Sequence, residues 1–541
     1  MHGIILGGIL EREDTSETRN QLDAQDDKDK PDFWPSIKRS AGAHRIATFL
    51  REEGWDIEVL DFWPAWTREE LEQFFESRVR EDTVWVGLSA MFPLGGSGKK
   101  NQQRVVELVE NLKYMKEKYP NLTWVGGSQN INATLAYPLD YYIGGFGEYG
   151  ILELLKKLTG KPNKCIVHRK HYWGHDRNVI ECQTDFPAYP FPNAHVKYEE
   201  RDFIQPDEIL TVELARGCKF QCKFCSFTVL GVKGDYSRCE QSLEDELRDN
   251  YERWGTTMYT ISDETVNDRP EKLKKIAGVV ERLPFKPQLS GFARADLLVA
   301  HGEEVWEDMW NMGFWSHFYG IETFNHQAGK YVGKGMNPDR LKDGLIKVRE
   351  WFQAKGKYRA TISMIIGIPH ETRETFLDAK DWVMKNMPGQ SYNFAPLMIS
   401  NNDSLRMMTN PSVFDKTWQE GNVFREKTHE ELGVDYNQIP EKLREVVEFY
   451  MKADGVLDWE HDDMTVWDAW KLFAEIVSTP ELPSKLGPGI FYYHRYITGG
   501  KYNLDDMRKT FADIKPLGVE NIKLHMSLIE DYKRKKLEIE R

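Results

Sequence analysis

The chain lacks the features of several large protein classes. The opening segment, MHGIILGGILERED, has an apolar run too short to cross a membrane, has no basic start and turns acidic at once, unlike a secretory signal. Positive charge is not in excess, because 72 Lys and Arg face 86 Asp and Glu for a formal charge of -14. A general nucleic-acid binder, which neutralises many phosphates, is therefore not expected. We expect a cytoplasmic protein with no membrane partner.

Cysteine is also scarce. Only six cysteines occur in 541 residues, and Cys218, Cys222 and Cys225 fall within eight consecutive positions. A disulfide scaffold would need more cysteines in a shorter chain. The cluster of three instead indicates metal binding in a reducing compartment.

Alternating strand and helix patterns fill the first 160 residues. Short apolar runs at 3–9, 83–92 and 122–128 alternate with amphipathic segments such as QQRVVELVENLKYMKEKY. This order predicts a doubly wound, Rossmann-like parallel sheet. Its ligand would bind at the carboxyl ends of the strands, in the loops at 89–97, 126–128 and 144–148. Glycines there would let a ligand approach the backbone, although tight turns alone require the same glycines.

Two segments do not fit this repeating pattern. Residues 11–33 are polar and mostly charged, which predicts a solvated loop; their position after the first strand would also suit a lid. Residues 161–205 are rich in Pro, Asn, His and Tyr and predict a linker between two domains.

The cysteine cluster follows a strand-like run in ILTVELARGCKFQCKFCSF, residues 209–227. Three thiolates can hold three irons of a four-iron cluster and leave the fourth iron open to a small molecule. The alternative is a structural zinc site that includes Cys239, fourteen residues after Cys225. Zinc knuckles use paired CxxC spacings, and the first gap here has three intervening residues, so the open cluster is favoured.

The CxxxCxxC spacing, with Phe224 before the last cysteine, resembles the signature of the radical S-adenosylmethionine (SAM) superfamily. Four later segments resemble motifs of the class with an N-terminal cobalamin-binding-like domain. They are YTISDETVND at 259–268, GFARADLL at 291–298, FYGIETFNHQAGKYVGKGMN at 318–337 and SMIIGIPHETRETF at 363–376. Each ends an apolar run and precedes a helical segment, and a sixth strand is expected at 391–400. This predicts a partial (β/α)6 TIM-type barrel over 206–400, with its chemistry at the strand ends.

The resemblance implies roles for individual residues. Cys218, Cys222 and Cys225 would hold a 4Fe-4S cluster. Phe224, Asp263, Glu264, Arg294, Glu322, Ile366 and Gly367 would contact the cofactors, with Arg294 and Glu322 at the polar ends of SAM and Ile366 and Gly367 beside its adenine. A structural ion pair or ordinary strand packing is the alternative for these seven. Aromatic residues on the barrel strands could line a substrate pocket, although most are expected in the core: Trp315, His317, Phe318, Tyr319, Tyr392 and Phe394.

The N-terminal sheet of residues 1–160 resembles a cobalamin-binding domain. This implies Ser89, Gly126, Gly127, Gly145 and Glu148 as cofactor contacts. No Asp-x-His-x-x-Gly motif is present to supply a histidine to cobalt. The region 401–541 is helical in pattern and is expected to form a C-terminal domain.

The resemblance thus predicts an enzyme that reductively cleaves SAM to a 5'-deoxyadenosyl radical, with electrons from an external flavodoxin- or ferredoxin-type reductant. Cobalamin-dependent methylation of an unactivated carbon is the favoured reaction. A cobalamin-independent rearrangement, oxidation or other carbon modification, and a non-enzymatic zinc or iron–sulfur module, are the alternatives. The catalytic residues and the substrate, a small molecule or a peptide, are not identified by the sequence.

Overall fold

The computed structural model describes residues 1–10, 37–89, 99–128, 134–135, 137–172, 174–186, 194–206, 208–225, 236–388, 390–399, 423–452, 456–478 and 526–538. The acidic segment 11–33, predicted as a loop or lid, lies outside these ranges. No helix in the described ranges is both long enough and apolar enough to cross a membrane.

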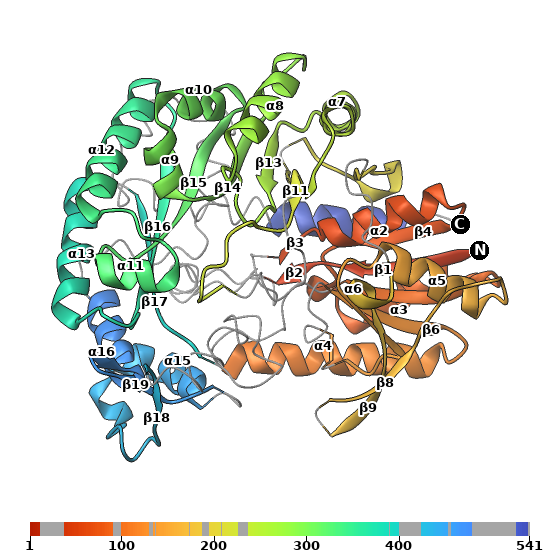
Figure 1. Cartoon of the computed structure of the whole chain (residues 1–541). Coiled ribbons are helices and arrows are strands. Elements are labelled where there is room, and N and C mark those ends of the chain that lie inside the picture. The colour runs from red at the N-terminus through yellow and green to blue at the C-terminus, as the bar shows by residue number, and fades with distance from the viewer. Residues whose placement is uncertain are drawn as a thin grey trace.

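A seven-stranded sheet forms the N-terminal part of the molecule (Figure 1), with strand order β4-β1-β5-β6-β7-β9-β8. All its pairings are parallel except that of β8 with β9. The strands are β1 (His2–Gly7), β4 (Asp56–Leu60), β5 (Thr83–Ser89), β6 (Thr123–Ser128), β7 (Tyr141–Gly144), β8 (His168–Tyr172) and β9 (His175–Glu181). The order reverses between β1 and β5, and ligands of open parallel sheets bind at such a switch point.

Apolar residues cover both faces of this sheet, as a doubly wound fold requires. One face packs on α3 (Arg68–Arg78) and α4 (Lys99–Lys118), and the other on α2 (Ala41–Glu52) and α5 (Glu148–Leu158). The helix at 526–538 joins the first face, since Leu528, Ile529 and Tyr532 lie in the same apolar cluster as Leu60 and Phe74. The two chain ends therefore lie close together in Figure 1.

A second, fully parallel sheet holds the predicted barrel strands in chain order. They are β10 (Ile209–Val212), β13 (Met258–Ile261), β14 (Gln288–Ala293), β15 (Phe314–Glu322), β16 (Arg359–Ile366) and β17 (Ser391–Pro396). β10 and β17 are the edges of this sheet, so the six strands form an open barrel. The α/β fold expected from the sequence, a doubly wound sheet followed by a partial barrel, is thus confirmed.

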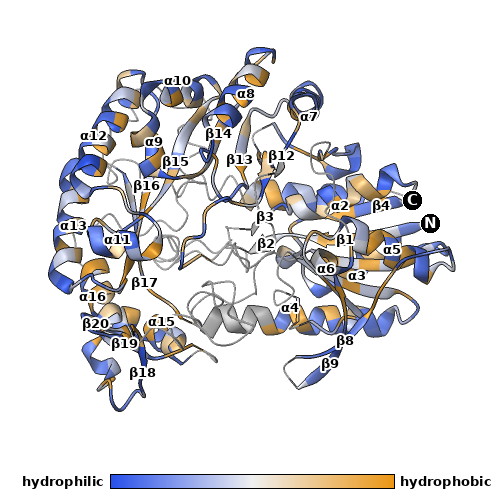
Figure 2. Cartoon of the chain, viewed as in Figure 1, coloured by the Kyte–Doolittle hydropathy of each residue, from blue (hydrophilic) through white to orange (hydrophobic). Residues whose placement is uncertain are grey.

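Helices follow the barrel strands and cover their outer side (Figures 1 and 2), where charged residues face solvent. They are α7 (Glu240–Trp254), α8 (Pro270–Glu281), α9 (Ala295–His301), α10 (Glu303–Asn311), α11 (His326–Val332), α12 (Pro338–Ala354) and α13 (Arg373–Asn386). One continuous apolar cluster joins these helices to the strands, as in any packed parallel sheet.

The segments between residues 423 and 478 pack on the end of the barrel. α15 (Glu441–Met451), α16 (Val466–Val477) and a small sheet of β18 (Arg425–Glu426), β19 (Trp459–His461) and β20 (Met464–Thr465) share its apolar cluster. The C-terminal region is therefore not purely helical. Two further strand pairs and one short helix lie elsewhere in the fold: β2 (Ile9–Leu10) with β3 (Ile37–Lys38), β11 (Ala215–Arg216) with β12 (Tyr236–Ser237), and α6 (Cys182–Asp185).

The segment 161–205, expected to be a linker, contributes β8 and β9 to the first sheet. Residues 168–172 and 175–181 contain no proline, so each can pair along its length. The proline-rich part of the segment begins only at Pro187. The prediction of a linker therefore does not hold for the first part of the segment. The composition of residues 161–205 taken together had hidden the difference between this part and the proline-rich part.

Candidate functional site

The cysteine loop begins at the end of β11 and is held by a buried carboxylate. Asp263, which directly follows β13, accepts hydrogen bonds from the backbone N–H groups of Leu214 (2.8 Å) and Ala215 (3.1 Å). Lys272 lies 3.4 Å from the same carboxyl group. Burial raises the pKa of Asp263 to about 6, although Lys272 and the two N–H groups oppose this shift. Asp263 thus positions the strand end that leads into the cysteines.

Cys222 lies near two basic residues, Arg294 at the end of β14 and Lys334 after α11. The Arg294 guanidinium at the end of β14 lies 3.5 Å from the sulfur of Cys222 and 4.0 Å from the ring centroid of Phe220. Burial raises the pKa of the Cys222 thiol, while Lys334 and Arg294 oppose this shift by favouring the thiolate. Thiolates are the form that binds iron, so the donor type and the neighbouring charges fit an iron–sulfur cluster.

Cys239 takes no part in this loop. It is the N-cap of α7, where its sulfur accepts a hydrogen bond from the N–H of Ser242 at 3.4 Å. Within the described ranges, no three Cys, His, Asp or Glu side chains are gathered around a point where one metal ion would fit. A mononuclear zinc site needs all its donors about 2.0–2.3 Å from the ion. The described side chains therefore do not form the zinc site considered from the sequence.

Glu322 stands above the barrel lumen in a strained backbone conformation. Its φ of 69° is in the left-handed region, and a register shift between Gly320 and Glu322 marks a bulge in β15. Its carboxylate accepts a hydrogen bond from the Lys334 ammonium at 2.9 Å. A side chain at Gly320 would collide with this carboxylate, since a Cβ atom there would lie 2.4 Å from it. The bulge and Gly320 together place the carboxylate over the lumen.

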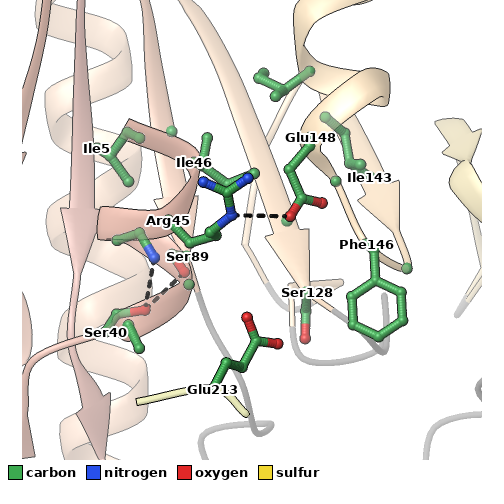
Figure 3. Close-up of a pocket in the computed structure, with 18 of the residues that line it drawn as sticks. Ile5, Ser40, Arg45, Ile46, Ser89, Ser128, Ile143, Phe146, Glu148 and Glu213 are labelled. Carbon is green, nitrogen blue, oxygen red and sulfur yellow. Dashed lines mark hydrogen bonds and ion pairs between the residues drawn. The ribbon is translucent and has the colours of Figure 1, made fainter. Parts of the chain in front are cut away.

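A large cavity opens where the first sheet meets the barrel (Figure 3). Its empty volume is about 1390 Å³, part of it open to solvent. The first sheet lines it at the carboxyl ends of its strands, on both sides of the switch point between β1 and β5, and β10 and β13 line it from the barrel. The residues that line the cavity include Ser89, Gly127, Gly145, Phe146, Glu148, Thr211, Glu213, Arg216, Ser262 and Glu264.

An ion-pair chain crosses this cavity from one sheet to the other. Arg216 lies 2.8 Å from Glu148 of α5 and 2.9 Å from Glu213, which follows β10. Its guanidinium also covers the Phe146 ring at 4.4 Å from the centroid, and Arg45 of α2 lies 3.5 Å from Glu148 (Figure 3). Burial alone would raise the pKa of Glu148, but the arginines hold it below its ordinary value.

Glu264 differs from these paired carboxylates. It lines the cavity, and burial raises its pKa to about 7. Its Oε2 atom is buried without a hydrogen-bond partner among the described residues. A buried carboxyl group of this kind is available to a ligand that offers a hydrogen bond.

The glycines expected at the cofactor differ in whether the space around their Cβ position belongs to the cavity or to the core. Gly127 lines the cavity, and a Cβ atom there would meet nothing within 4 Å. Gly145 also lines it and has a φ of 96°, which favours glycine. Gly126 faces the core instead, because a Cβ atom there would lie 2.4 Å from Leu139. Ser89 lines the cavity, with its hydroxyl 2.9 Å from that of Ser40 (Figure 3).

Ile366 and Gly367, the two residues expected beside adenine, pack against other parts of the chain. Ile366 is fully buried and belongs to the apolar cluster between strands and helices. Gly367, with a φ of 95°, makes room for Trp459 of the C-terminal sheet, since a Cβ atom would lie 2.4 Å from that indole. Phe224, by contrast, lies beside the cysteine loop, 5.5 Å from the Lys334 ammonium.

Sequence reasoning passed over two basic residues of the site. Lys334 lies in the Lys-Gly pair of the segment that resembles the Gly-Ile-Glu motif, yet it was not assigned a role. Arg216 directly precedes Gly217 and Cys218, and only the fold brings it to Glu148. The available signal was the strand end for Arg216 and the place within the motif for Lys334.

Comparison with known proteins agrees with this geometry. Residues 212–383 match the model of the Radical SAM superfamily. The chain is 23% identical over 363 residues to a hopanoid C-3 methylase from Methylococcus capsulatus, which covers 64% of each protein. It is 24% identical over 243 residues to an uncharacterised methyltransferase from Pyrococcus horikoshii, covering 44% of this chain and 50% of that protein. The matches thus span about half to two thirds of these curated relatives.

Solved structures extend the similarity to the whole fold. The radical SAM methyltransferase TsrM from Kitasatospora setae, solved with tryptophan and a SAM analogue, superposes with a TM-score of 0.60 at 14% identity. The superposition covers 98% of this chain and 99% of that one. The cobalamin-dependent radical SAM enzyme OxsB gives a TM-score of 0.51 at 15% identity over 78% of this chain and 62% of that one. The barrel therefore matches the Radical SAM superfamily over residues 212–383, and the whole chain has the overall fold of TsrM.

Proposed function

We propose that this enzyme transfers a methyl group to an unactivated carbon in a reaction that depends on SAM and cobalamin. Residues 1–160 would bind cobalamin, and the barrel of residues 206–400 would bind the cluster and SAM. The observation that carries this proposal is the cavity shared by the two sheets, which joins the carboxyl edge of the first sheet to the mouth of the barrel. A methyl carrier bound there would face the barrel lumen.

The lining of the cavity leaves room for a cofactor at the strand ends of the first sheet. Gly127 and Gly145 both line it, and a Cβ atom at Gly127 would meet nothing within 4 Å. Relatives with the same fold or related sequence are named as methylases or as cobalamin-dependent enzymes. Together these observations support a cofactor at the switch point of the sheet.

The barrel residues suit the cluster and SAM. Cys218, Cys222 and Cys225 would hold the 4Fe-4S cluster, which supplies the electron that cleaves SAM, while cobalamin supplies a methyl carrier. Arg294 would stabilise the Cys222 thiolate and reach the carboxylate of SAM. Glu322 would accept hydrogen bonds from the amino group or the ribose of SAM. Phe224 and Glu264 would complete the contacts.

The electron donor would be a flavodoxin- or ferredoxin-type protein. Lys219, Lys223 and Lys330 lie on two segments that contact each other beside the cysteine loop, with the Lys223 N–H donating to the Val332 carbonyl at 3.3 Å. We call these three lysines the basic rim. Neither segment, 217–225 or 326–336, contains Asp or Glu, in a chain with a net charge of -14. An acidic electron carrier would therefore meet its complement next to the cluster.

The experiment that tests the proposal follows cobalamin and the methyl group separately. Protein produced anaerobically with cobalamin should show the cobalamin absorption spectrum, and methyl-labelled SAM should pass its label to a product in a cell extract. Gly127→Leu should lose cobalamin, because the new side chain would fill the cavity, yet keep its iron and its formation of 5'-deoxyadenosine. Gly278→Leu, in α8 with only the Arg282 Nη1 atom near its Cβ position at 3.9 Å, is the matched control.

Cysteine variants distinguish an iron–sulfur cluster from a structural zinc site that includes Cys239. Cys222→Ala should lose most of its iron and form no 5'-deoxyadenosine, whereas Cys239→Ala should retain both, since Cys239 is the N-cap of α7 and lies outside the cysteine loop. A wild-type protein with cluster and SAM cleavage but no bound cobalamin would favour the cobalamin-independent alternative. Zinc in place of iron, lost equally in both cysteine variants, would contradict both enzyme readings.

A further inference from the structure

The barrel sheet has two chemically different faces. Alternate side chains of each strand, such as Leu289, Tyr319, Ile362 and Phe394, belong to the apolar cluster under the helices. The intervening residues must point to the other side, into the lumen, because side chains alternate along a strand. Trp315, His317, Tyr319, Tyr392 and Phe394 are accordingly buried, and of the aromatics singled out from the sequence Phe318 alone is on the lumen side.

Register pairing arranges the lumen residues in rows across the strands. The lowest row pairs Thr211 with Thr260, Thr260 with Ser290 and Ser290 with Ser316. We call these four residues the hydroxyl row. It starts at the cavity, which Thr211 lines, and continues under the lumen. The Ser316 hydroxyl is buried at 1% exposure and has no hydrogen-bond partner in the described parts of the chain.

An aromatic pair forms the next row towards the strand ends. Phe292 is paired in register with Phe318, and their ring centroids lie 4.9 Å apart in an edge-to-face arrangement. Two residues along a strand span about 6.6 Å, so this pair lies about that distance above the hydroxyl row. Phe292 is 39% exposed although it belongs to a central strand whose outer side is covered by helices. Its open face must therefore be in the lumen.

The aromatic pair lies directly below the residues proposed to hold SAM. Arg294 follows Phe292 by two residues on β14, and Gly320, over which the Glu322 carboxylate lies, follows Phe318 by two residues on β15. The top row continues through Ser363 and Asn393, whose side chains lie 3.2 Å apart. A group resting on Phe292 would thus lie between the SAM residues above and the hydroxyl row below.

The charged side chains that border these rows already have partners. Arg294 is paired with Asp296 and Glu322 with Lys334 at the top row, and Arg359, also partnered, is 5% exposed beside Ser316 at the edge of the hydroxyl row. A charged substrate group placed between the rows would lose its hydration and would have to displace an existing partner to gain an opposite charge. An uncharged ring would keep its stacking contact and could bond to a hydroxyl.

From these contacts, and resting on the proposed function, we infer the substrate class: the part of the substrate that enters the lumen is an uncharged, planar ring with one hydrogen-bonding group. Phe292 and Phe318 form its stacking platform, and Ser316 meets its polar group. Substituents outside the lumen are not restricted by these residues.

A fluorinated probe tests this inference without knowledge of the substrate. Binding of 5-fluoroindole to the anaerobically reconstituted enzyme, with SAM present, would be measured by fluorine NMR. Phe292→Ala should weaken binding about tenfold, as loss of one aromatic stacking partner does elsewhere. Ser316→Ala should weaken it severalfold, while Ile166→Ala, at a surface residue 47% exposed, should leave it unchanged. The charged probe 4-fluorobenzoate should bind at least tenfold more weakly than 5-fluoroindole.

Equal binding of 5-fluoroindole by the wild type and Phe292→Ala, no binding at all, or tighter binding of 4-fluorobenzoate would overturn the inference. Phe292→Leu retains apolar volume in the sheet and should fold normally. If Phe292→Ala binds 5-fluoroindole weakly because the aromatic ring is lost and not because folding is lost, Phe292→Leu should bind it equally weakly. Formation of 5'-deoxyadenosine and bound cobalamin, measured on the same samples, report on the proposed function. That function can thus fail while the probe still binds, and the two failures remain distinguishable.

Discussion

Glu371 is a buried carboxyl group with a single partner. It is 0% exposed, and its Oε1 accepts a hydrogen bond from the Thr323 hydroxyl at 2.5 Å, while Oε2 has no partner in the described structure. Burial raises its pKa from 4.5 to about 8, so it is protonated near neutral pH. Thr323 directly follows Glu322, and Glu371 thereby supports the loop that carries a proposed SAM contact.

Glu371→Gln should change how stability depends on pH. In the wild type the folded state keeps a proton that the unfolded state releases above pH 4.5, so stability should fall from pH 4.5 to about 8. The fall should be about 1.4 kcal/mol per pH unit. The variant, which cannot ionise there, should lose this slope and melt at a higher temperature at pH 7.5. Melting curves between pH 5 and 8 check this; the exposed-site variant Glu374→Gln should remain parallel to the wild type.

At the residue scale, the motifs predicted which strand end a residue lies at, but not which face of the sheet it points to. Arg294 and Glu322 were expected at strand ends, and the structure brings both towards the lumen mouth. Gly126 and Gly127 were indistinguishable in sequence, yet one faces the core and the other the cavity. Adjacent strand residues point to opposite faces, and the sequence of a doubly covered strand does not mark which face meets the ligand.

At the scale of elements, the C-terminal helix at 526–538 supports a sheet formed some 470 residues earlier. The Lys536 ammonium lies 2.9 Å from Glu58 of β4, with exposures of 0% and 4% for the two side chains. The Asp61 N–H donates to the Tyr532 hydroxyl at 2.9 Å, and Arg78 donates to the Lys536 carbonyl at 2.9 Å. The helix therefore closes one face of the N-terminal sheet with both apolar and charged contacts.

Lys536→Ala should destabilise the N-terminal sheet, because Glu58 would stay buried with Arg78, 3.4 Å away, as its remaining partner. Loss of one member of a buried pair costs about 3–5 kcal/mol, and Arg78 should reduce this to the lower end. The double variant Lys536→Met, Glu58→Met should recover part of the loss, because the Glu58 charge is removed while Arg78 keeps its hydrogen bonds to Ser77 and to the carbonyl of residue 536. Urea unfolding of all three proteins measures this, and equal loss in the single and double variants would contradict it.

The apolar periodicity of the sequence predicted most helices and strands, but not which segments far apart in the chain pack together. The strand and helix order up to residue 160 and the six barrel strands were expected from apolar patterns. The amphipathic pattern of the last helix did not reveal that Tyr532 packs beside Phe62. β8 and β9 were missed because their residues are mostly polar and only half covered. β8 is the edge strand of the sheet and β9 lies next to it, and such strands lack the apolar run that marks a central strand.

At the scale of the whole molecule, the two sheets share one cavity. Arg216, two residues before the first cysteine, pairs with Glu148 of the first sheet's last helix. Any shift of the first sheet relative to the barrel would separate this buried pair. The geometry therefore links the position of the cysteine loop to the site proposed for cobalamin, which a domain-by-domain reading of the sequence did not show.

The basic rim beside the cysteine loop makes the route of electron entry testable. Lys219→Glu with Lys330→Glu would reverse two charges on a surface that would otherwise attract an acidic carrier. With reduced flavodoxin, the rate of 5'-deoxyadenosine formation should fall at least about tenfold at low salt, and the wild-type rate should fall as salt rises and charges are screened. Reduced methyl viologen, a small cation that needs no docking surface, should support both proteins equally.

The control is the double variant Lys164→Glu, Lys452→Glu, which reverses the same number of charges at exposed lysines outside the two rim segments. It should match the wild type with either reductant, because attraction between a carrier and distant charges is screened within about 10 Å at 0.1 M salt. Equal loss with flavodoxin and methyl viologen in the rim variant would mean that the cluster itself is damaged. Unchanged rates with flavodoxin would place electron entry at another face of the barrel, since the cluster would then be reduced without these lysines.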